Sequence, residues 1–140
     1  MREIQKDNQT VYVSRSGKEY DNKWECAEVD LCDVADEIQK LPTIVAVNAE
    51  DVKTIHADTD FDVYCFVPKT RKEIDLLREA AELAGYSRLP DYDLIGKPVC
   101  VDFGRDCEDA NIFNLNDHLA RITKKITGII DKVESRAKEN

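Results

Sequence analysis

The stretch that decides the fold is residues 61–85, which read FDVYCFVPKTRKEIDLLREAAELAG. From Val63 to Val67 the side chains are apolar or aromatic on both faces of an extended chain. This pattern is typical of a strand inside a sheet that is covered on both sides. Pro68 cannot donate a backbone hydrogen bond to a neighbouring strand, so the strand is predicted to end there.

The second half of this stretch predicts a helix from Thr70 to Ala84. Thr70 and Glu73 have the spacing of a capping box, in which each side chain bonds the backbone amide of the other residue. Apolar residues then recur at helical spacing, at Ile74, Leu76, Leu77, Ala80, Ala81, Leu83 and Ala84. Gly85 readily adopts the left-handed conformation that closes a helix.

The chain has 140 residues, of which 42% are hydrophobic and 35% are charged. This profile is typical of one folded domain, predicted to span residues 1–140, rather than of a disordered chain. No apolar run approaches the roughly 20 residues that a membrane helix needs. The N-terminal residues also lack the apolar segment of a signal peptide. We therefore expect a cytoplasmic protein without a membrane partner.

Cysteine usage agrees with that compartment. The chain has five cysteines, Cys26, Cys32, Cys65, Cys100 and Cys107. Their number is odd and no two have C-x-x-C spacing, so we expect free thiols, several of them in the core. No cofactor is predicted.

The charge balance is strongly acidic. The chain carries 20 basic and 29 acidic side chains, a net charge of −9 at pH 7. The excess is uneven, because residues 1–70 hold 8 basic and 15 acidic side chains, a net of −7. Direct binding of nucleic acid needs clustered lysine and arginine, so this balance argues against it. It favours a protein partner with a basic surface.

Further elements are expected on the N-terminal side of the central stretch. Residues 1–9 are polar and predicted to be frayed. Strands are predicted at residues 10–14, 23–28, 43–47 and 52–57, with a single helical turn as the alternative for the last of them. Asp30 is predicted to cap a helix that ends at Lys40, before a proline.

On the C-terminal side, residues 86–98 contain two prolines and a glycine and predict a long loop. Residues 99–103 alternate as a strand does, and residues 104–111 predict a polar loop. Asn116 is predicted to cap the last helix, which extends to about Arg136.

This last helix carries an apolar seam. Its members recur at alternating spacings of four and three residues, at Leu115, Leu119, Ile122, Ile126, Ile129 and Val133. A repeat of this kind over nearly three heptads is typical of a coiled coil. Ile130 widens the seam, which favours packing across a sheet, and a homodimer through this helix is the alternative.

Together these elements predict an α+β fold in a single domain. We expect a mostly antiparallel sheet of about five or six strands with three helices. The long C-terminal helix is expected to pack on the sheet, on the same face as the helix at residues 70–84.

One candidate binding group is a run of alternating aspartates. In an extended chain Asp58, Asp60 and Asp62 share one face. The calcium-loop pattern fails here, because Val63 occupies the glycine position and Lys69 that of the closing glutamate. We therefore predict an acidic docking patch or a solvated strand entry, and no metal site.

The loop at residues 86–98 holds the second candidate group. Asp91, Tyr92 and Asp93 combine two carboxylates with tyrosine, a residue enriched at interface hot spots. Long loops are often binding sites, and the alternative is that Tyr92 and Ile95 tuck this loop onto the core.

Enzyme signatures are incomplete. His56 and the neighbouring aspartates could serve a small metal-dependent hydrolase. No nucleophile elbow, helix-borne metal pair or phosphate-binding glycine loop accompanies them in the sequence. No catalytic residue is therefore assigned, and protein binding is favoured over catalysis.

The specific expectation is an acidic inhibitor that docks its carboxylates on the basic surface of a nucleic-acid-acting protein. Anti-CRISPR, anti-restriction and nuclease immunity proteins act in this way as classes, and the analogy rests on size and charge. The alternatives are the metal-dependent hydrolase and a homodimeric structural or accessory subunit.

Overall fold

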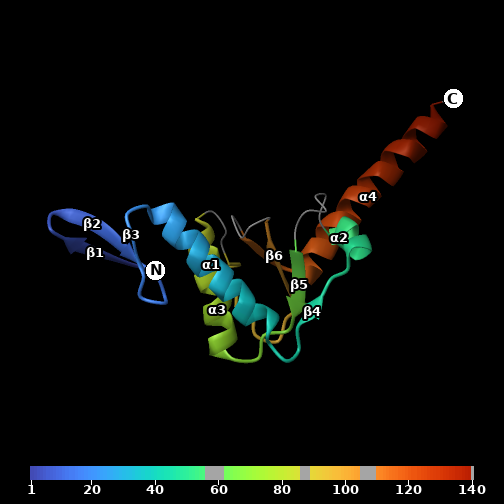
Figure 1. The fold of residues 1–140 in the computed structure, drawn as a ribbon. Coiled ribbons are helices and arrows are strands. Elements are labelled where there is room, and N and C mark those ends of the chain that lie inside the picture. The colour runs from blue at the N-terminus through green and yellow to red at the C-terminus, as the bar shows by residue number, and fades with distance from the viewer. Residues whose placement is uncertain (56–61, 86–88, 105–109, 140) are drawn as a thin grey trace.

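Two antiparallel sheets and four helices make up the residues that the computed structural model describes, which are 1–55, 62–85, 89–104 and 110–139. The predicted α+β class is confirmed, with one helix more than expected. In Figure 1 a three-stranded sheet lies at one end, a four-stranded sheet with helices lies in the middle, and the C-terminal helix extends from the other end.

The N-terminal sheet is built on a hairpin that the sequence interpretation missed. β1 (Arg2–Lys6) and β2 (Gln9–Val13) pair around Asp7 and Asn8, whose φ angles are 50° and 65°. Two left-handed residues in succession match the twist of a hairpin, and Asp and Asn tolerate that conformation. The expectation that the N-terminal residues are frayed is therefore wrong. β3 (Glu19–Tyr20) completes the sheet.

Helix α1 (Lys23–Gln39) begins earlier than predicted. Asn22, and not Asp30, is its N-cap, and the Asn22 side chain accepts hydrogen bonds from the first-turn amides. The strand expected at residues 23–28 is wrong because Cys26 extends the buried face of the helix. Residues 23–28 alternate as a strand does, but burial of the helix face against the rest of the fold favours a helix there.

The second sheet has four antiparallel strands in the order β4 (Val45–Ala46), β5 (Asp62–Phe66), β6 (Val99–Phe103) and β7 (Ala110–Asn114). β5 and β6 confirm two predicted strands. β6 is buried along its whole length because its side chains enter the core clusters on both faces of the sheet. β4 is shorter than the strand predicted at residues 43–47, and β7 begins inside the predicted polar loop.

The helix predicted from the central stretch is confirmed as α3 (Arg71–Ala84). The Thr70 hydroxyl accepts a hydrogen bond from the Glu73 amide, and the Glu73 carboxylate accepts one from the Thr70 amide. Gly85 closes the helix with a left-handed φ of 83°. Both ends of α3 are therefore fixed by residues that were recognisable in the sequence.

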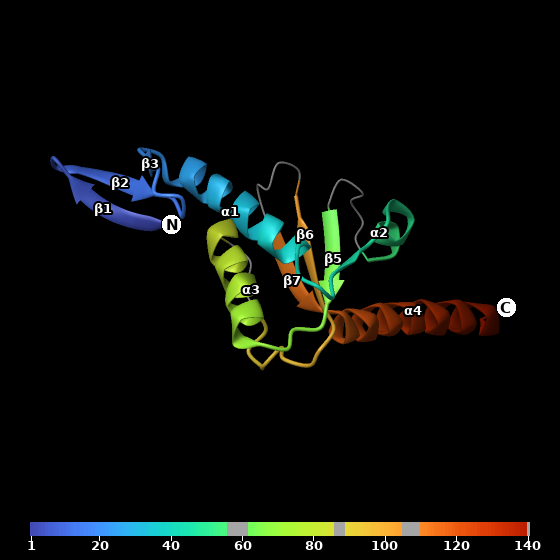
Figure 2. The ribbon, with the colours of Figure 1, turned by 60° about the horizontal axis from the view of Figure 1, so that its bottom comes forward.

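α1 and α3 lie side by side over one face of the second sheet (Figures 1 and 2). Their inner faces and the facing strand residues form the main core. Its buried members include Leu31, Val34, Ile38, Phe66, Ile74, Leu77, Val99, Val101 and Ile112. Because full burial of a large apolar side chain contributes roughly 1.5–3 kcal/mol, we infer that this layer supplies most of the stability.

The opposite face of the sheet is covered by less of the chain. Helix α2 (Ala49–Ile55) places Val52 against Val63 and Cys100 there, and Leu115 packs beside them. Among the described residues, the core cluster on this face has three buried members, Val52, Val63 and Cys100. The cluster on the other face is larger, because two long helices contribute to it.

Helix α2 replaces a predicted strand. The strand expected at residues 52–57 is wrong over residues 52–55, which are helical. The Asn48 side chain accepts a hydrogen bond from the Asp51 amide at 2.9 Å, as an N-cap residue does. The alternative of a short helical segment was the correct one for these residues.

Helix α4 (Leu115–Lys138) packs on the sheet at its start and then leaves it. The predicted packing is confirmed where Leu115 joins the smaller core cluster and α4 contacts β7. That cluster lies on the face opposite α3, so the expectation of a shared face is wrong. Beyond this contact α4 projects from residues 1–114, which we call the body (Figures 1 and 2). None of the helices in the described residues has the length and apolar composition to cross a membrane.

Asp30 joins the N-terminal sheet to α1. Its buried carboxylate accepts a hydrogen bond from the Arg15 amide at 2.9 Å and forms an ion pair with the Met1 ammonium group at 3.0 Å. Arg15 in turn pairs with Glu37 of α1 and Glu79 of α3. These carboxylates raise the pKa of the Arg15 guanidinium, with the hydrogen bond to Glu37 as the largest cause. Asp30 and Arg15 thus hold the N-terminal sheet against both helices.

Replacement of this buried carboxylate should therefore destabilise the fold. We expect Asp30→Ala to lower the free energy of unfolding by about 2–3 kcal/mol, because it leaves the Arg15 amide and the Met1 ammonium group without their acceptor. Urea denaturation followed by circular dichroism measures the change. The exposed Asp36 on the same helix supplies the control, Asp36→Ala. Equal stability of the two variants would contradict the anchoring role.

Candidate protein-docking surfaces

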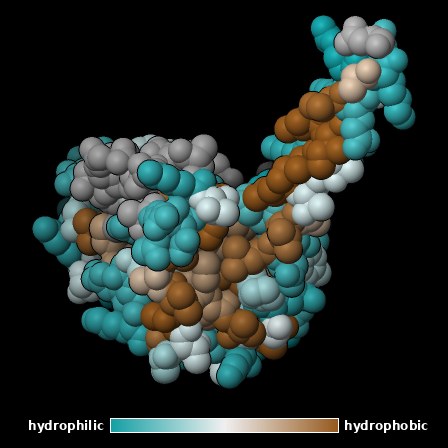
Figure 3. Space-filling view, turned by 90° about the vertical axis from the view of Figure 1, so that its right-hand side faces the viewer, coloured by the Kyte–Doolittle hydropathy of each residue, from teal (hydrophilic) through white to brown (hydrophobic). Residues whose placement is uncertain are grey.

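Helix α4 presents its apolar seam to solvent. Five large apolar side chains on it are 48–63% exposed: Leu119, Ile126, Ile129, Ile130 and Val133. No residue of α4, which the structure describes in full, is buried. Figure 3 shows an apolar band that follows the projecting helix. Contiguous apolar patches of this kind on a protein surface mark sites of interaction.

The dimensions of the sheet explain why the seam is uncovered. Over the described residues, the strands of the four-stranded sheet have at most five residues, a length of roughly 17 Å. The 24 residues of α4 extend about 36 Å as a helix. At about 1.5 Å per residue a sheet of this length could cover roughly 11 residues of a helix, so the seam from Ile126 onward lies beyond its reach. Leu119 is also exposed, because α4 projects from the body after its first turn (Figures 1 and 2). The sequence showed the seam, but it did not show that the sheet was too short to bury it.

An apolar hollow of about 450 Å³ lies at the base of α4. It is lined by Thr43, Val45, Cys65, Phe66, Val67, Lys69, Pro98 and Leu115. Two of its large apolar residues, Val45 and Val67, are exposed. Leu115 belongs both to this hollow and to the seam, so the apolar surface continues from the helix onto the body (Figure 3).

Two cysteine thiols meet beneath this hollow. Cys65 of β5 and Cys100 of β6 are directly opposite each other in the antiparallel register. The hydrogen bond from Cys100 lowers the pKa of Cys65, and the same bond together with burial raises the pKa of Cys100. Cys65 is partly exposed and lines the hollow, whereas Cys100 is buried. Cys65 is therefore the thiol of this pair that is placed to react.

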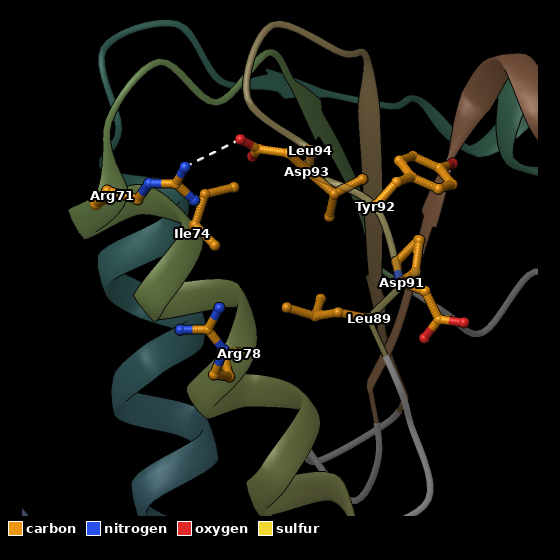
Figure 4. Close-up of a pocket in the computed structure, with 9 residues that line it drawn as sticks. Arg71, Ile74, Arg78, Leu89, Asp91, Tyr92, Asp93 and Leu94 are labelled. Atoms are coloured by element: carbon orange, nitrogen blue, oxygen red, sulfur yellow. Dashed lines mark hydrogen bonds and ion pairs between the residues drawn. The ribbon is translucent and has the colours of Figure 1, made fainter.

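A second hollow, of about 430 Å³, lies between α3 and the segment 89–94 (Figure 4). Arg71, Ile74 and Arg78 line it from α3, and Leu89, Pro90, Asp91, Tyr92, Asp93 and Leu94 line it from the segment. Asp93 pairs with Arg71 across one end at 3.0 Å. Leu94 is buried in the main core. Of the two residues expected to tuck the loop onto the core, Ile95 packs against the main core, whereas Tyr92 is exposed.

The three candidate residues of this loop make different contacts. The Tyr92 hydroxyl donates to the Asp117 carboxylate of α4, and this bond raises the pKa of Tyr92. The Asp93 carboxylate accepts a hydrogen bond from the Ile95 amide at 3.0 Å, and this bond is the largest cause of the lowered pKa of Asp93. The ion pair with Arg71 lowers this pKa further. Asp91 is exposed at the rim of the hollow. The loop thus ties the base of α4 to the body, and its role in binding stays a prediction.

The other candidates from the sequence lie mostly outside the described residues. Asp58 and Asp60 fall there, and so does His56. Asp62 is exposed at the start of β5. Within the part of the chain that the structure describes, no three His, Cys, Asp or Glu side chains are grouped to hold a metal ion. The alternating aspartates as a docking patch and the hydrolase both stay predictions.

Charge is divided between the body and the helix. Residues 1–114 carry 14 basic and 25 acidic side chains, a net of −11. Residues 115–140 carry 6 basic and 4 acidic side chains, a net of +2. Three of these basic residues, Lys132, Arg136 and Lys138, are close to the C-terminal end of α4. The projecting helix is therefore basic and apolar, whereas the body is strongly acidic.

Comparison with known protein families, with curated proteins and with solved structures finds no match to this chain. Its function must therefore be inferred from its own surfaces. The seam was visible in the sequence as a heptad repeat. Both hollows depend on residues from separate elements, and no local pattern in the sequence indicated them.

The thiol pair at the base of α4 allows a direct chemical test. We expect iodoacetamide to alkylate Cys65 faster than Cys100, because Cys65 is more exposed and has the lowered pKa. Cys100→Ala should slow alkylation of Cys65 near pH 7, because loss of the hydrogen-bond donor returns its pKa towards the ordinary value and reduces the thiolate fraction. Peptide mass spectrometry over a series of pH values measures the rates.

The matched control is Cys26→Ala, which removes a buried thiol far along the chain from the pair. It should leave the pH profile of Cys65 unchanged. An unchanged profile in Cys100→Ala would contradict the hydrogen bond between the two thiols.

Proposed function

We propose that the protein is a non-enzymatic protein-binding module that docks through the apolar seam of α4. The observation that carries this proposal is the exposure of five large apolar side chains on one projecting helix. Their spacing is that of a coiled-coil seam, which another amphipathic helix can cover by inserting its side chains between them. The body then acts as the rigid base that positions the helix.

The physical argument starts from the cost of this exposure. An isolated helix has marginal stability in water, and most helices gain stability from packing of an apolar face. α4 has such a face and, among the residues that the structure describes, packs only at its start. A partner that covers the seam would stabilise the helix and remove an aggregation-prone surface from water.

The acidic body supports a second, narrower candidate. With a net charge of −11, residues 1–114 present a field that attracts a basic surface. We propose on this ground an inhibitor of a nucleic-acid-acting protein, of the anti-CRISPR, anti-restriction or immunity-protein type. Asp62, Asp91 and Asp93 are exposed carboxylates of this body. In the sequence Asp58 and Asp60 form one candidate group with Asp62, and Tyr92 forms the other with Asp91 and Asp93.

Substitution within the seam tests the main proposal. The tagged protein and its variants are used to capture partners from a lysate of the cells that produce it. We expect Ile126→Glu to abolish capture, because a carboxylate in the centre of a helix interface would be buried without a partner. Thr127→Glu, one residue further, adds the same charge on the outer face and should capture as the native chain does.

Salt separates the two candidates in the same experiment. Apolar docking through the seam should persist as salt is raised, whereas docking through the acidic body should weaken with screening. Equal capture by both glutamate variants would overturn docking through the seam. If capture by both variants also does not change as salt is raised, the proposal of an acidic inhibitor would be overturned as well.

A further inference from the structure

We infer that the partner of the seam is α4 of a second copy of this chain, bound in the antiparallel direction. This inference rests on the proposed function, because it names the partner of the same surface. Three observations carry it: the seam pairs with itself without a gap, the charges of body and helix oppose each other, and the apolar surface continues onto the body at the base of α4.

The seam is self-complementary when two copies run in opposite directions. One register places Leu115 opposite Val133 of the second copy, Leu119 opposite Ile129, and Ile122 opposite Ile126. All six seam residues of each copy then face an apolar residue of the other, with a- and d-type positions alternating across the interface. No polar residue interrupts the seam in this register.

The charge distribution selects this direction over the parallel one. A parallel pair would bring two bodies, each with a net charge of −11, to the same end of the helices. In the antiparallel register the two Leu115 residues are 18 residues apart along the paired helices, so the points at which the bodies attach are separated by about 27 Å, more than three times the Debye length of about 8 Å at physiological salt. Near the centre of this pair, Lys125 of one copy flanks the seam close to Lys125 of the other. Their long side chains can keep both charged ends in water.

The ends of the helices also fit the antiparallel pair. The basic C-terminal turns of one copy, with Arg136 and Lys138, would reach the acidic body of the other. The first turn of α2 there carries Glu50 and Asp51, and α2 shares a core cluster with the base of α4. The apolar hollow that includes Val45 lies at the same place, so the end of the second helix would cover it.

Sedimentation equilibrium over a range of protein concentrations tests the association. We expect the native chain and Thr127→Glu to form a dimer at micromolar concentration and Ile126→Glu to remain a monomer. The alkylation rate of Cys65 should fall severalfold as the native dimer forms, because the second helix covers the hollow that this thiol lines. A native chain that is monomeric at all concentrations would overturn the inference.

Disulfide cross-linking tests the direction. Leu119→Cys and Ile129→Cys are prepared separately, one with a tag of different mass, and oxidised alone and as a mixture. The antiparallel register places residue 119 opposite residue 129, so the mixed disulfide should form in the mixture and dominate over self-linked dimers. As a control, the native chain is oxidised under the same conditions, and any cross-link that it forms comes from its native cysteines.

The outcomes separate this inference from the function on which it rests. Self-linked dimers of either variant alone would indicate a parallel pair and overturn the antiparallel inference. A monomeric chain that still captures a different protein, with loss of capture in Ile126→Glu, would overturn the second copy as partner and leave the seam as a docking surface. A monomeric chain with no seam-dependent capture would overturn both.

Discussion

The four-stranded sheet has two faces, and the chain covers them unequally. Among the described residues, α1 and α3 fill one face with the main core, whereas the seven residues of α2 and the first turn of α4 pack on the other. Strands of five residues cannot support a helix of 24 residues along its length. The exposure of the seam from Ile126 onward follows from this mismatch in length, and Leu119 is exposed because α4 already projects from the body there.

Local sequence signals predicted the elements that have strong caps. The Thr70–Glu73 capping box and Gly85 defined α3 because both act over a few residues. The start of α1 was missed, and a helical turn at α2 was only the alternative to a strand, because their apolar residues alternate too briefly to distinguish helix from strand. The N-terminal hairpin had a signal in Asp7 and Asn8, whose residue types tolerate the left-handed conformation of a tight turn.

The candidate sites show where a single sequence becomes insufficient. The heptad repeat identified the seam, but whether a seam is core or interface depends on the size of the surface against which it could pack. The hollow at the base of α4 combines Val45, Cys65 and Leu115 from three elements, so only the fold brings it together. The division of charge between body and helix also could not be predicted from the sequence, because the fold shows that α4 projects from residues 1–114.

The central claim is that α4 is stabilised by a partner that binds its seam. Amide hydrogen exchange along residues 119–133 tests it most directly, in dilute and in concentrated solutions of the pure protein. We predict fast exchange in dilute solution, because a helix without tertiary packing opens readily, and strong protection in concentrated solution. Equal and strong protection of these amides in a dilute, monomeric sample would contradict the account, because the seam would then be covered within its own chain.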